Sequence, residues 1–130
     1  MIERRLKLML VDDDPVNNMV NQKRIKKHIP EVDVIVYSDG RSAYNYFLNH
    51  HNNLPELILL DINMPIMSGW QFLDEFVKLN IETIQVYMLT SSIAREDYDK
   101  SLTYKPVKGF IVKPLDDEKL KEVLNSFLNQ

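Results

Sequence analysis

Acidic, hydroxyl-bearing and basic side chains directly follow four short apolar segments of this sequence. In chain order they are Asp12-Asp13-Asp14, Asp61, Thr90-Ser91-Ser92 and Lys113-Pro114. Carboxylates crowded at one point repel one another, so at neutral pH they need a compensating cation. A hard divalent ion fits this need, and Mg2+ suits a site that offers few carboxylates, waters and a phosphate oxygen. If the segments converge, these residue types predict a magnesium centre.

The charges of these groups nearly balance once a metal is present. Asp12, Asp13 and Asp61 carry three negative charges, and Mg2+ together with Lys113 supplies three positive ones. A phosphoryl group would add roughly two negative charges. The metal, the Lys113 ammonium and a hydroxyl donor are the groups able to stabilise them.

The apolar segments that must position these groups have the character of buried β-strands. We predict five of them, at Leu6–Val11, Val32–Tyr37, Leu57–Leu60, Ile84–Leu89 and Lys108–Val112. Several are apolar at nearly every residue, which is typical of parallel strands covered by helices on both faces.

Helix start signals lie between the predicted strands. The expected N-caps are Asp14 before Pro15, Asp39, Ser68 and Asp116. In the last helix Leu115 and Leu120 are spaced as a hydrophobic staple. Asp14 is interpreted as a cap, although the run of three aspartates leaves open which two form the acidic pair.

Two of the expected helices are poorly patterned. In the first, Asn17 and Asn21 interrupt an apolar stripe of Val16 and Val20. The fourth, Arg95–Leu102, carries few core residues. Five strand–helix repeats with short connections nevertheless predict an α/β fold, a doubly wound parallel sheet with right-handed crossovers. In such sheets chemistry collects beyond the carboxyl ends of the strands.

The motifs together resemble the receiver domain of two-component response regulators. They are Asp12-Asp13, Asp61-Ile62-Asn63-Met64-Pro65 with Gly69, Thr90-Ser91, Phe110 and Lys113-Pro114. The resemblance covers essentially the whole chain, 1–130, as a single domain. It implies a flavodoxin-like (βα)5 fold with strand order 2-1-3-4-5.

The resemblance also implies how the acidic residues act. Asp61 would attack a donor phosphorus and become an aspartyl phosphate. Asp13, Asp61 and the Asn63 backbone carbonyl would bind Mg2+, with Asp12 acting through water and Mn2+ as an alternative ion. The donor would be a sensor histidine kinase or a histidine phosphotransfer protein.

The remaining motif residues are expected to transmit the change. Lys113 would pair with Asp61 and then with a phosphoryl oxygen, after a cis Lys113–Pro114 bond. The Thr90 hydroxyl would swing toward the phosphoryl group, and Phe110 would rotate into the vacated space. The face formed by the fourth helix, the fifth strand and the fifth helix would thereby change shape.

The composition sets the cellular context. Hydrophobic residues make up 45% of the chain and charged residues 27%, as in a soluble globular protein. A net charge of −3 gives no electrostatic footprint for nucleic acid, the chain has no cysteine, and no apolar run is long enough to cross a bilayer. We expect a cytoplasmic domain with no membrane partner, monomeric or dimerising on phosphorylation.

Several functions compete with a stand-alone regulator that signals by protein contact. An aspartate-nucleophile phosphatase would carry a second aspartate two residues after the nucleophile, where this chain has Asn63. A flavodoxin-type cofactor module would need a hydroxyl- and glycine-rich loop after the first strand instead of three anions. We therefore expect no enzymatic activity beyond the domain's own phosphorylation and dephosphorylation. A phosphorelay shuttle and an end-point regulator stay open.

Other conspicuous residues lie outside these motifs. The three histidines, His28, His50 and His51, are interpreted as surface residues far from the strand ends. Trp70 is expected to pack within the third helix. An exposed contact surface and ordinary packing remain alternatives for Tyr98, Leu102 and Tyr104.

Overall fold

A computed structural model describes residues 5–129 as five parallel strands in the order β2-β1-β3-β4-β5. The strands are β1 (Lys7–Val11), β2 (Asp33–Tyr37), β3 (Leu57–Asp61), β4 (Gln85–Thr90) and β5 (Val107–Val112). The predicted fold class and strand order are confirmed, and each predicted strand agrees with the observed one to within one residue at either end. The outermost residues of the expected domain, 1–4 and 130, lie outside the described part of the chain.

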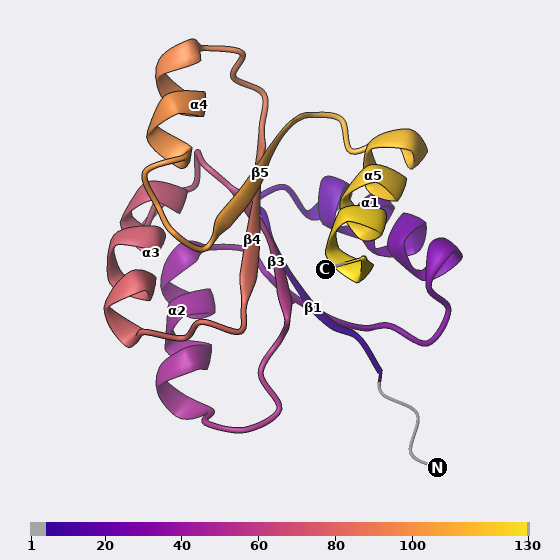
Figure 1. Ribbon diagram of the computed structural model, residues 1–130, viewed down its shortest axis with the longest axis horizontal. Coiled ribbons are helices and arrows are strands. Elements are labelled where there is room, and N and C mark those ends of the chain that lie inside the picture. The colour runs from indigo at the N-terminus through magenta and orange to yellow at the C-terminus, as the bar shows by residue number, and fades with distance from the viewer. Residues whose placement is uncertain (1–4, 130) are drawn as a thin grey trace.

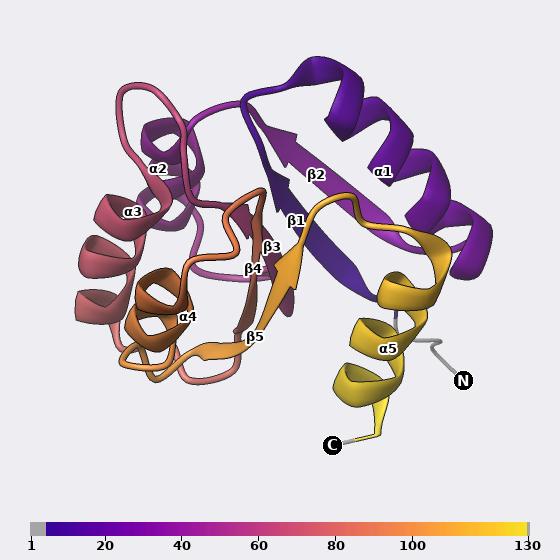
Figure 2. The same ribbon diagram turned by 90° about the horizontal axis from the view of Figure 1, so that it is seen from above.

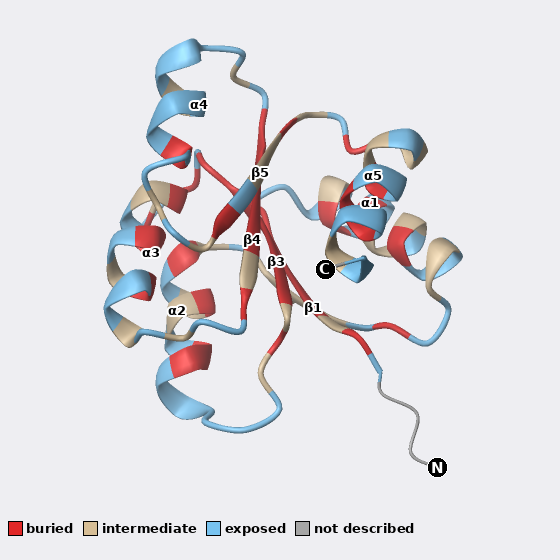
Figure 3. Ribbon diagram, in the orientation of Figure 1, coloured by how far each residue is buried: buried red, intermediate tan, exposed pale blue. Residues whose placement is uncertain are grey.

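Helices cover both faces of the sheet. They are α1 (Pro15–His28), α2 (Gly40–Asn49), α3 (Gly69–Phe76) followed by a short 3-10 turn η1 (Val77–Leu79), α4 (Arg95–Ser101) and α5 (Asp117–Leu128). Helices α1 and α5 lie on one face, and α2, α3 and α4 lie on the other (Figures 1 and 2). The central strands between them are almost wholly buried (Figure 3).

The four expected helix caps are all present. The Asp14 side chain accepts hydrogen bonds from the backbone N–H groups of Val16 and Asn17, so this aspartate serves α1. Ser68 forms a reciprocal capping box with Gln71 at the start of α3. The Asp39 and Asp116 side chains cap α2 and α5 by accepting hydrogen bonds from the N–H groups of Ser42 and Lys119. Each cap satisfies backbone donors that a helix start leaves unpaired.

The predicted apolar stripe of α1 is wrong. Val16 and Val20 are 60% and 41% exposed, whereas the buried residues of the helix are Asn18, Asn21 and Ile25. The helix is therefore rotated so that two amides face the sheet and the valines face solvent. One of these amides, that of Asn18, is held inward by a hydrogen bond to the Asp12 carbonyl.

Helix α4 is the least embedded element, as its sequence indicates. Ser101 is its one buried residue. An aromatic contact fixes the chain that follows it, because Tyr104 stacks on Trp70 of α3 with ring centroids 6.0 Å apart. None of the helices between residues 5 and 129 is long and apolar enough to cross a membrane.

Candidate functional site

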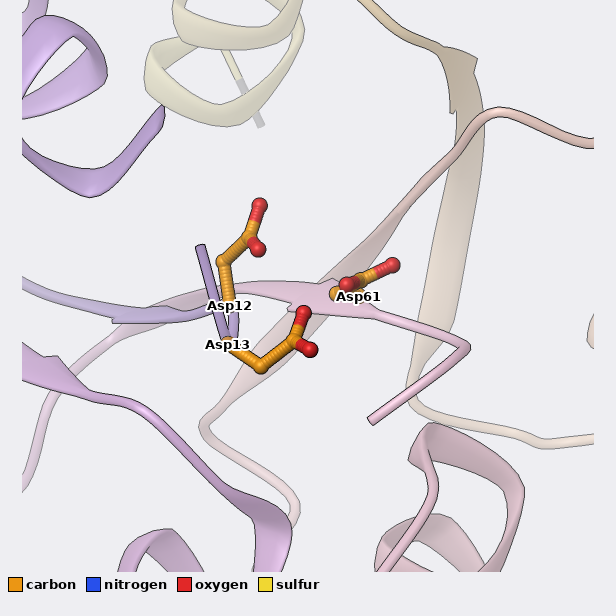
Figure 4. Close-up of side chains that lie close together, drawn as sticks. All are labelled: Asp12, Asp13 and Asp61. Carbon is orange, nitrogen blue, oxygen red and sulfur yellow. The ribbon is translucent and has the colours of Figure 1, made fainter. Parts of the chain in front are cut away.

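Three carboxylates meet at the carboxyl ends of β1 and β3. Asp12, Asp13 and Asp61 each offer an oxygen, and these oxygens lie within 4.8 Å of one another. Figure 4 shows the three side chains gathered at this edge of the sheet. Their convergence follows from strand pairing, because Val11 of β1 lies opposite Leu60 of β3 and the aspartates come next in each chain segment. The acidic pair is thus Asp12 and Asp13, and Asp14 is left to cap α1.

Asp12 is fully buried and is hydrogen-bonded through every polar group. Its two carboxylate oxygens accept from the Asp14 N–H at 2.9 Å and from the Lys113 Nζ at 2.8 Å. Its backbone N–H donates to the Tyr37 carbonyl, and its own carbonyl accepts from the Asn18 amide at 2.7 Å. A buried charge needs such partners, so Asp12 is the structural centre of the cluster.

Lys113 lies between the two buried carboxylates. Its Nζ is 2.8 Å from Asp12 and 3.5 Å from Asp61, so the expected pairing with Asp61 is the longer of two contacts. Burial works against its charge, but the hydrogen bond and attraction of Asp12, joined by Asp61, raise the pKa of Lys113 above the ordinary lysine value. The Lys113–Pro114 peptide bond is cis, as the resemblance implied.

Asp61 is held in an environment that disfavours its charge. Burial raises its pKa to about 6, and the nearby Asp12 carboxylate adds to the rise. Lys113 and a hydrogen bond from the Asn63 backbone act in the opposite direction. The result is a carboxylate that is ionised at neutral pH yet poorly compensated, which is the condition in which an added cation binds well.

The donor set fits a hard divalent ion. It consists of carboxylate oxygens from two strand ends, with one of the three side chains, Asp13, exposed to solvent. One ammonium beside three carboxylates leaves the cluster negative, and the oxygen ligands match the preference of Mg2+. The start of α3 packs closely against the end of β3, because an added methyl group at Gly69 would collide with the Asp61 carbonyl oxygen.

Thr90 and Phe110 belong to β4 and β5, the strands that precede and follow α4 in the chain. Thr90 ends β4 and is fully buried, and its hydroxyl accepts a hydrogen bond from the Ser92 N–H at 2.9 Å. Its carbonyl accepts from the Lys113 N–H at 2.7 Å, which joins the ends of β4 and β5. Phe110 of β5 is half-buried and meets the Tyr98 ring of α4 edge-on, with centroids 5.7 Å apart.

The histidines take no part in this cluster. His50 and His51 are exposed, as expected. His28 is not a free surface residue, because its Nε2 lies 3.2 Å from Asp117 of α5. Sequence reasoning missed Asn18, which contacts the site from α1. The signal that could have found it is the recurrence of asparagine at positions 18 and 21, which lie on one side of the helix.

The chain matches the sequence model of the response regulator receiver domain over residues 8–125. It is 30% identical over 123 residues to two-component response regulator 24 of Arabidopsis thaliana, which covers 95% of this chain and 84% of that protein. The chemotaxis protein CheY of Bacillus subtilis is 26% identical over 95% of this chain and 98% of its own. The chain thus belongs to the response regulator receiver domain family.

Solved structures agree with this assignment. A two-component response regulator from Cytophaga hutchinsonii is 28% identical, with a TM-score of 0.85, 98% of this chain covered and 100% of that chain. The CheX–CheY–BeF3–Mg complex of Borrelia burgdorferi is 25% identical, with a TM-score of 0.83, 95% of this chain covered and 89% of that chain. Other relatives are longer, because the chain spans 50% of MalR from Bacillus subtilis and 16% of PRR37 from rice.

Proposed function

We propose that this receiver domain accepts a phosphoryl group on Asp61 from a histidine kinase or a histidine phosphotransfer protein, in a reaction that requires Mg2+. The observation that carries the proposal is the convergence of Asp12, Asp13 and Asp61 around one point, with Lys113 between the two buried carboxylates. The relative from Borrelia burgdorferi, solved with BeF3 and Mg2+, supports the choice of ion.

The chemistry assigned to Asp61 is nucleophilic. One carboxylate oxygen attacks the phosphorus of a phosphohistidine, the P–N bond breaks, and the donor imidazole leaves with the electron pair. Asp13, Asp61 and the Asn63 carbonyl would hold Mg2+, with Asp12 acting through water. The bound ion supplies positive charge at the oxygens where negative charge gathers during transfer.

Lys113 and Thr90 provide the remaining stabilisation. Lys113 rests on Asp12 at 2.8 Å and lies 3.5 Å from Asp61, so a small shift of its ammonium group brings it to a phosphoryl oxygen on Asp61. The Thr90 hydroxyl gives up its contact with the Ser92 N–H and donates to the same group. Both are interactions with charge that arrives only with the phosphoryl group.

The proposed output is a change at the α4–β5–α5 face. Movement of Thr90 empties space beside β4, Phe110 rotates inward, and its edge-on contact with Tyr98 of α4 is lost. Helix α4 is suited to respond because Ser101 is its one buried residue. Weakly embedded elements are the ones that move in switching proteins.

The domain is proposed to act alone in the cytoplasm, as a monomer or a phosphorylation-dependent dimer. It would turn over no external substrate, and its output would be protein contact or transfer of the phosphoryl group to a phosphotransfer protein. Its relatives include both proteins of similar length and longer ones, since the chain covers 98% of Bacillus subtilis CheY and 50% of MalR from the same species.

Labelling with a small phosphodonor such as acetyl phosphate tests the assignment of the acceptor. In Mg2+ the native protein should gain one acid- and base-labile phosphoryl group, whereas Asp61→Asn should gain none. Asp14→Asn is the matched control, because asparagine caps a helix as well as aspartate does and labelling should persist. Undiminished labelling of Asp61→Asn, with the phosphoryl group recovered at another residue, would reject the proposal.

A further inference from the structure

Helix α1 turns an amide toward the acidic loop in place of an apolar side chain. Asn18 is 6% exposed, and its Nδ2 donates a 2.7 Å hydrogen bond to the backbone carbonyl of Asp12. Val16 and Val20, which hydrophobic burial alone would place inward, face solvent. The orientation of α1 therefore gives up apolar burial and gains a fixed contact with the residue that begins the acidic cluster.

The chemistry of this contact determines which end of the Asn18 amide faces the loop. The Asp12 carbonyl can only accept a hydrogen bond, so the atom that meets it must be the Asn18 nitrogen. The Asn18 Oδ1 is then turned away, and it is buried without a hydrogen-bond partner. A buried unpaired acceptor costs stability, and such a cost in a native structure calls for a functional reason.

The Asn18 contact acts on both carboxylates of the β1–α1 loop. The peptide unit that carries the Asp12 carbonyl also contains the backbone nitrogen of Asp13, so fixing this unit restricts how the two side chains are presented. On its other side Asp12 is tied to the Tyr37 carbonyl through its own N–H. The peptide units on both sides of the Asp12 Cα are thus pinned by partners from different elements.

We propose that Asn18 is a positioning residue of the divalent-cation site. It acts through the Asp12 peptide and touches neither the ion nor the phosphoryl group. The inference rests on the proposed function, since it assumes that the acidic cluster binds Mg2+. Partners that hold metal-binding groups in place commonly change metal affinity by about 10- to 100-fold when removed.

The variant Asn18→Leu separates positioning from ordinary stability. Leucine has a similar volume and removes the amide donor, which leaves the Asp12 carbonyl unpaired. The same change deletes the unpaired Oδ1, so the number of buried acceptors without partners stays the same. We therefore expect nearly unchanged urea unfolding in metal-free buffer and an Mg2+ dissociation constant, by calorimetry without phosphodonor, raised about 10-fold.

Two further variants make the result decisive. Asn21→Leu changes the other buried asparagine of α1, one turn farther from the acidic loop, and should leave Mg2+ affinity unaltered. Asp13→Asn changes a proposed ligand and should weaken Mg2+ binding in every case. If Asp13→Asn binds Mg2+ normally, the metal site itself is misassigned and the proposed function fails.

The outcome for Asn18 then has a clear meaning. Loss of Mg2+ affinity in Asn18→Leu with retained stability supports the positioning role. Lower stability with native Mg2+ affinity overturns it and leaves Asn18 a packing residue. Should Asn18→Leu fail to fold, Asn18→Ala decides by the same comparison, because alanine is the residue best tolerated in a helix.

Discussion

Asp61 combines burial with a neighbouring carboxylate, and its protonation is therefore linked to folding. It is 5% exposed, and burial is the main cause of its pKa of about 6. This value lies above the ordinary aspartate pKa of 3.8. Between those two pH values the folded protein binds more protons than the unfolded chain, so stability falls as pH rises through this window.

The variant Asp61→Asn should consequently stabilise the metal-free protein at neutral pH. The free energy of unfolding at pH 7.5 should rise by about 2–3 kcal/mol, because the cost of the buried charge is removed. At pH 4, where Asp61 is already largely protonated in the folded protein, the gain should nearly vanish. Urea unfolding of both proteins at the two pH values measures this, and an equal gain at both would contradict the assigned pKa shift.

At the scale of residues, the sequence predicted which side chains meet but not how they pair. Asp12, Asp13, Asp61 and Lys113 were identified because each directly follows a strand, and parallel strands end at one edge. The preference of Lys113 for Asp12 depends on side-chain depth and angle, which the order of residues does not encode. The role of Asn18 could not be predicted from the sequence, because it depends on one hydrogen bond to a backbone carbonyl.

Among the elements, α1 departs most from its sequence pattern. Asn18 and Asn21 face inward with Ile25, while Val16 and Val20 face solvent. Periodicity failed here because hydrophobic spacing is a statistical guide, and local hydrogen bonds at the acidic loop favoured another rotation of the helix. In α2, α3 and α5, by contrast, apolar side chains occupy the buried side of the helix.

Substitutions on the two faces of α1 test this orientation. Val16→Gln should change the free energy of unfolding by less than about 0.5 kcal/mol, because the side chain is already exposed. Ile25→Ala should destabilise by about 2–4 kcal/mol, because it removes fully buried methyl groups. Urea unfolding compares the variants, and a cost for Val16→Gln as large as that for Ile25→Ala would place Val16 in the core.

Helix α4 is tied to α3 by a cluster around Trp70. Tyr104 stacks on Trp70 with an interplanar angle of 16°, and the Lys100 Nζ lies 4.7 Å from the centre of the indole. The Tyr104 hydroxyl donates a 2.7 Å hydrogen bond to Asp74. Burial, helped by the Asp74 carboxylate, raises the pKa of Tyr104 to about 12. Trp70 thus packs beyond its own helix, and Tyr104 is a packing residue.

Loss of the Tyr104 hydroxyl should loosen this connection. Tyr104→Phe is expected to lower the free energy of unfolding by about 0.5–1.5 kcal/mol, because Asp74 loses its donor. Amide exchange in α4 should accelerate, and the emission of Trp70, the single tryptophan of the chain, should change. Tyr98→Phe, on α4 itself, is the control and should leave Trp70 emission unchanged. Identical exchange in Tyr104→Phe and the native protein would show that the cluster does not restrain α4.

At the scale of the whole molecule, the order of the strands brings the chemistry together. Strands β1 and β3 lie side by side at the centre of the sheet, so Asp12 and Asp61 meet although 49 positions separate them in the chain. Alternating strands and helices with short connections predicted a doubly wound parallel sheet. The strand order itself was implied by the resemblance to receiver domains. The rotation of individual helices was not predictable, since it is decided by contacts between elements.

The central claim is that one cation and one phosphoryl group share the site formed by Asp12, Asp13 and Asp61. A crystal structure of the protein with Mg2+ and beryllofluoride, a mimic of the phosphoryl group, tests it most directly. We expect beryllium bonded to an Asp61 oxygen, Mg2+ bound by Asp13, Asp61 and the Asn63 carbonyl, and Lys113 moved from Asp12 toward a fluoride. Beryllium on another residue, or Mg2+ bound away from Asp13 and Asp61, would contradict the account.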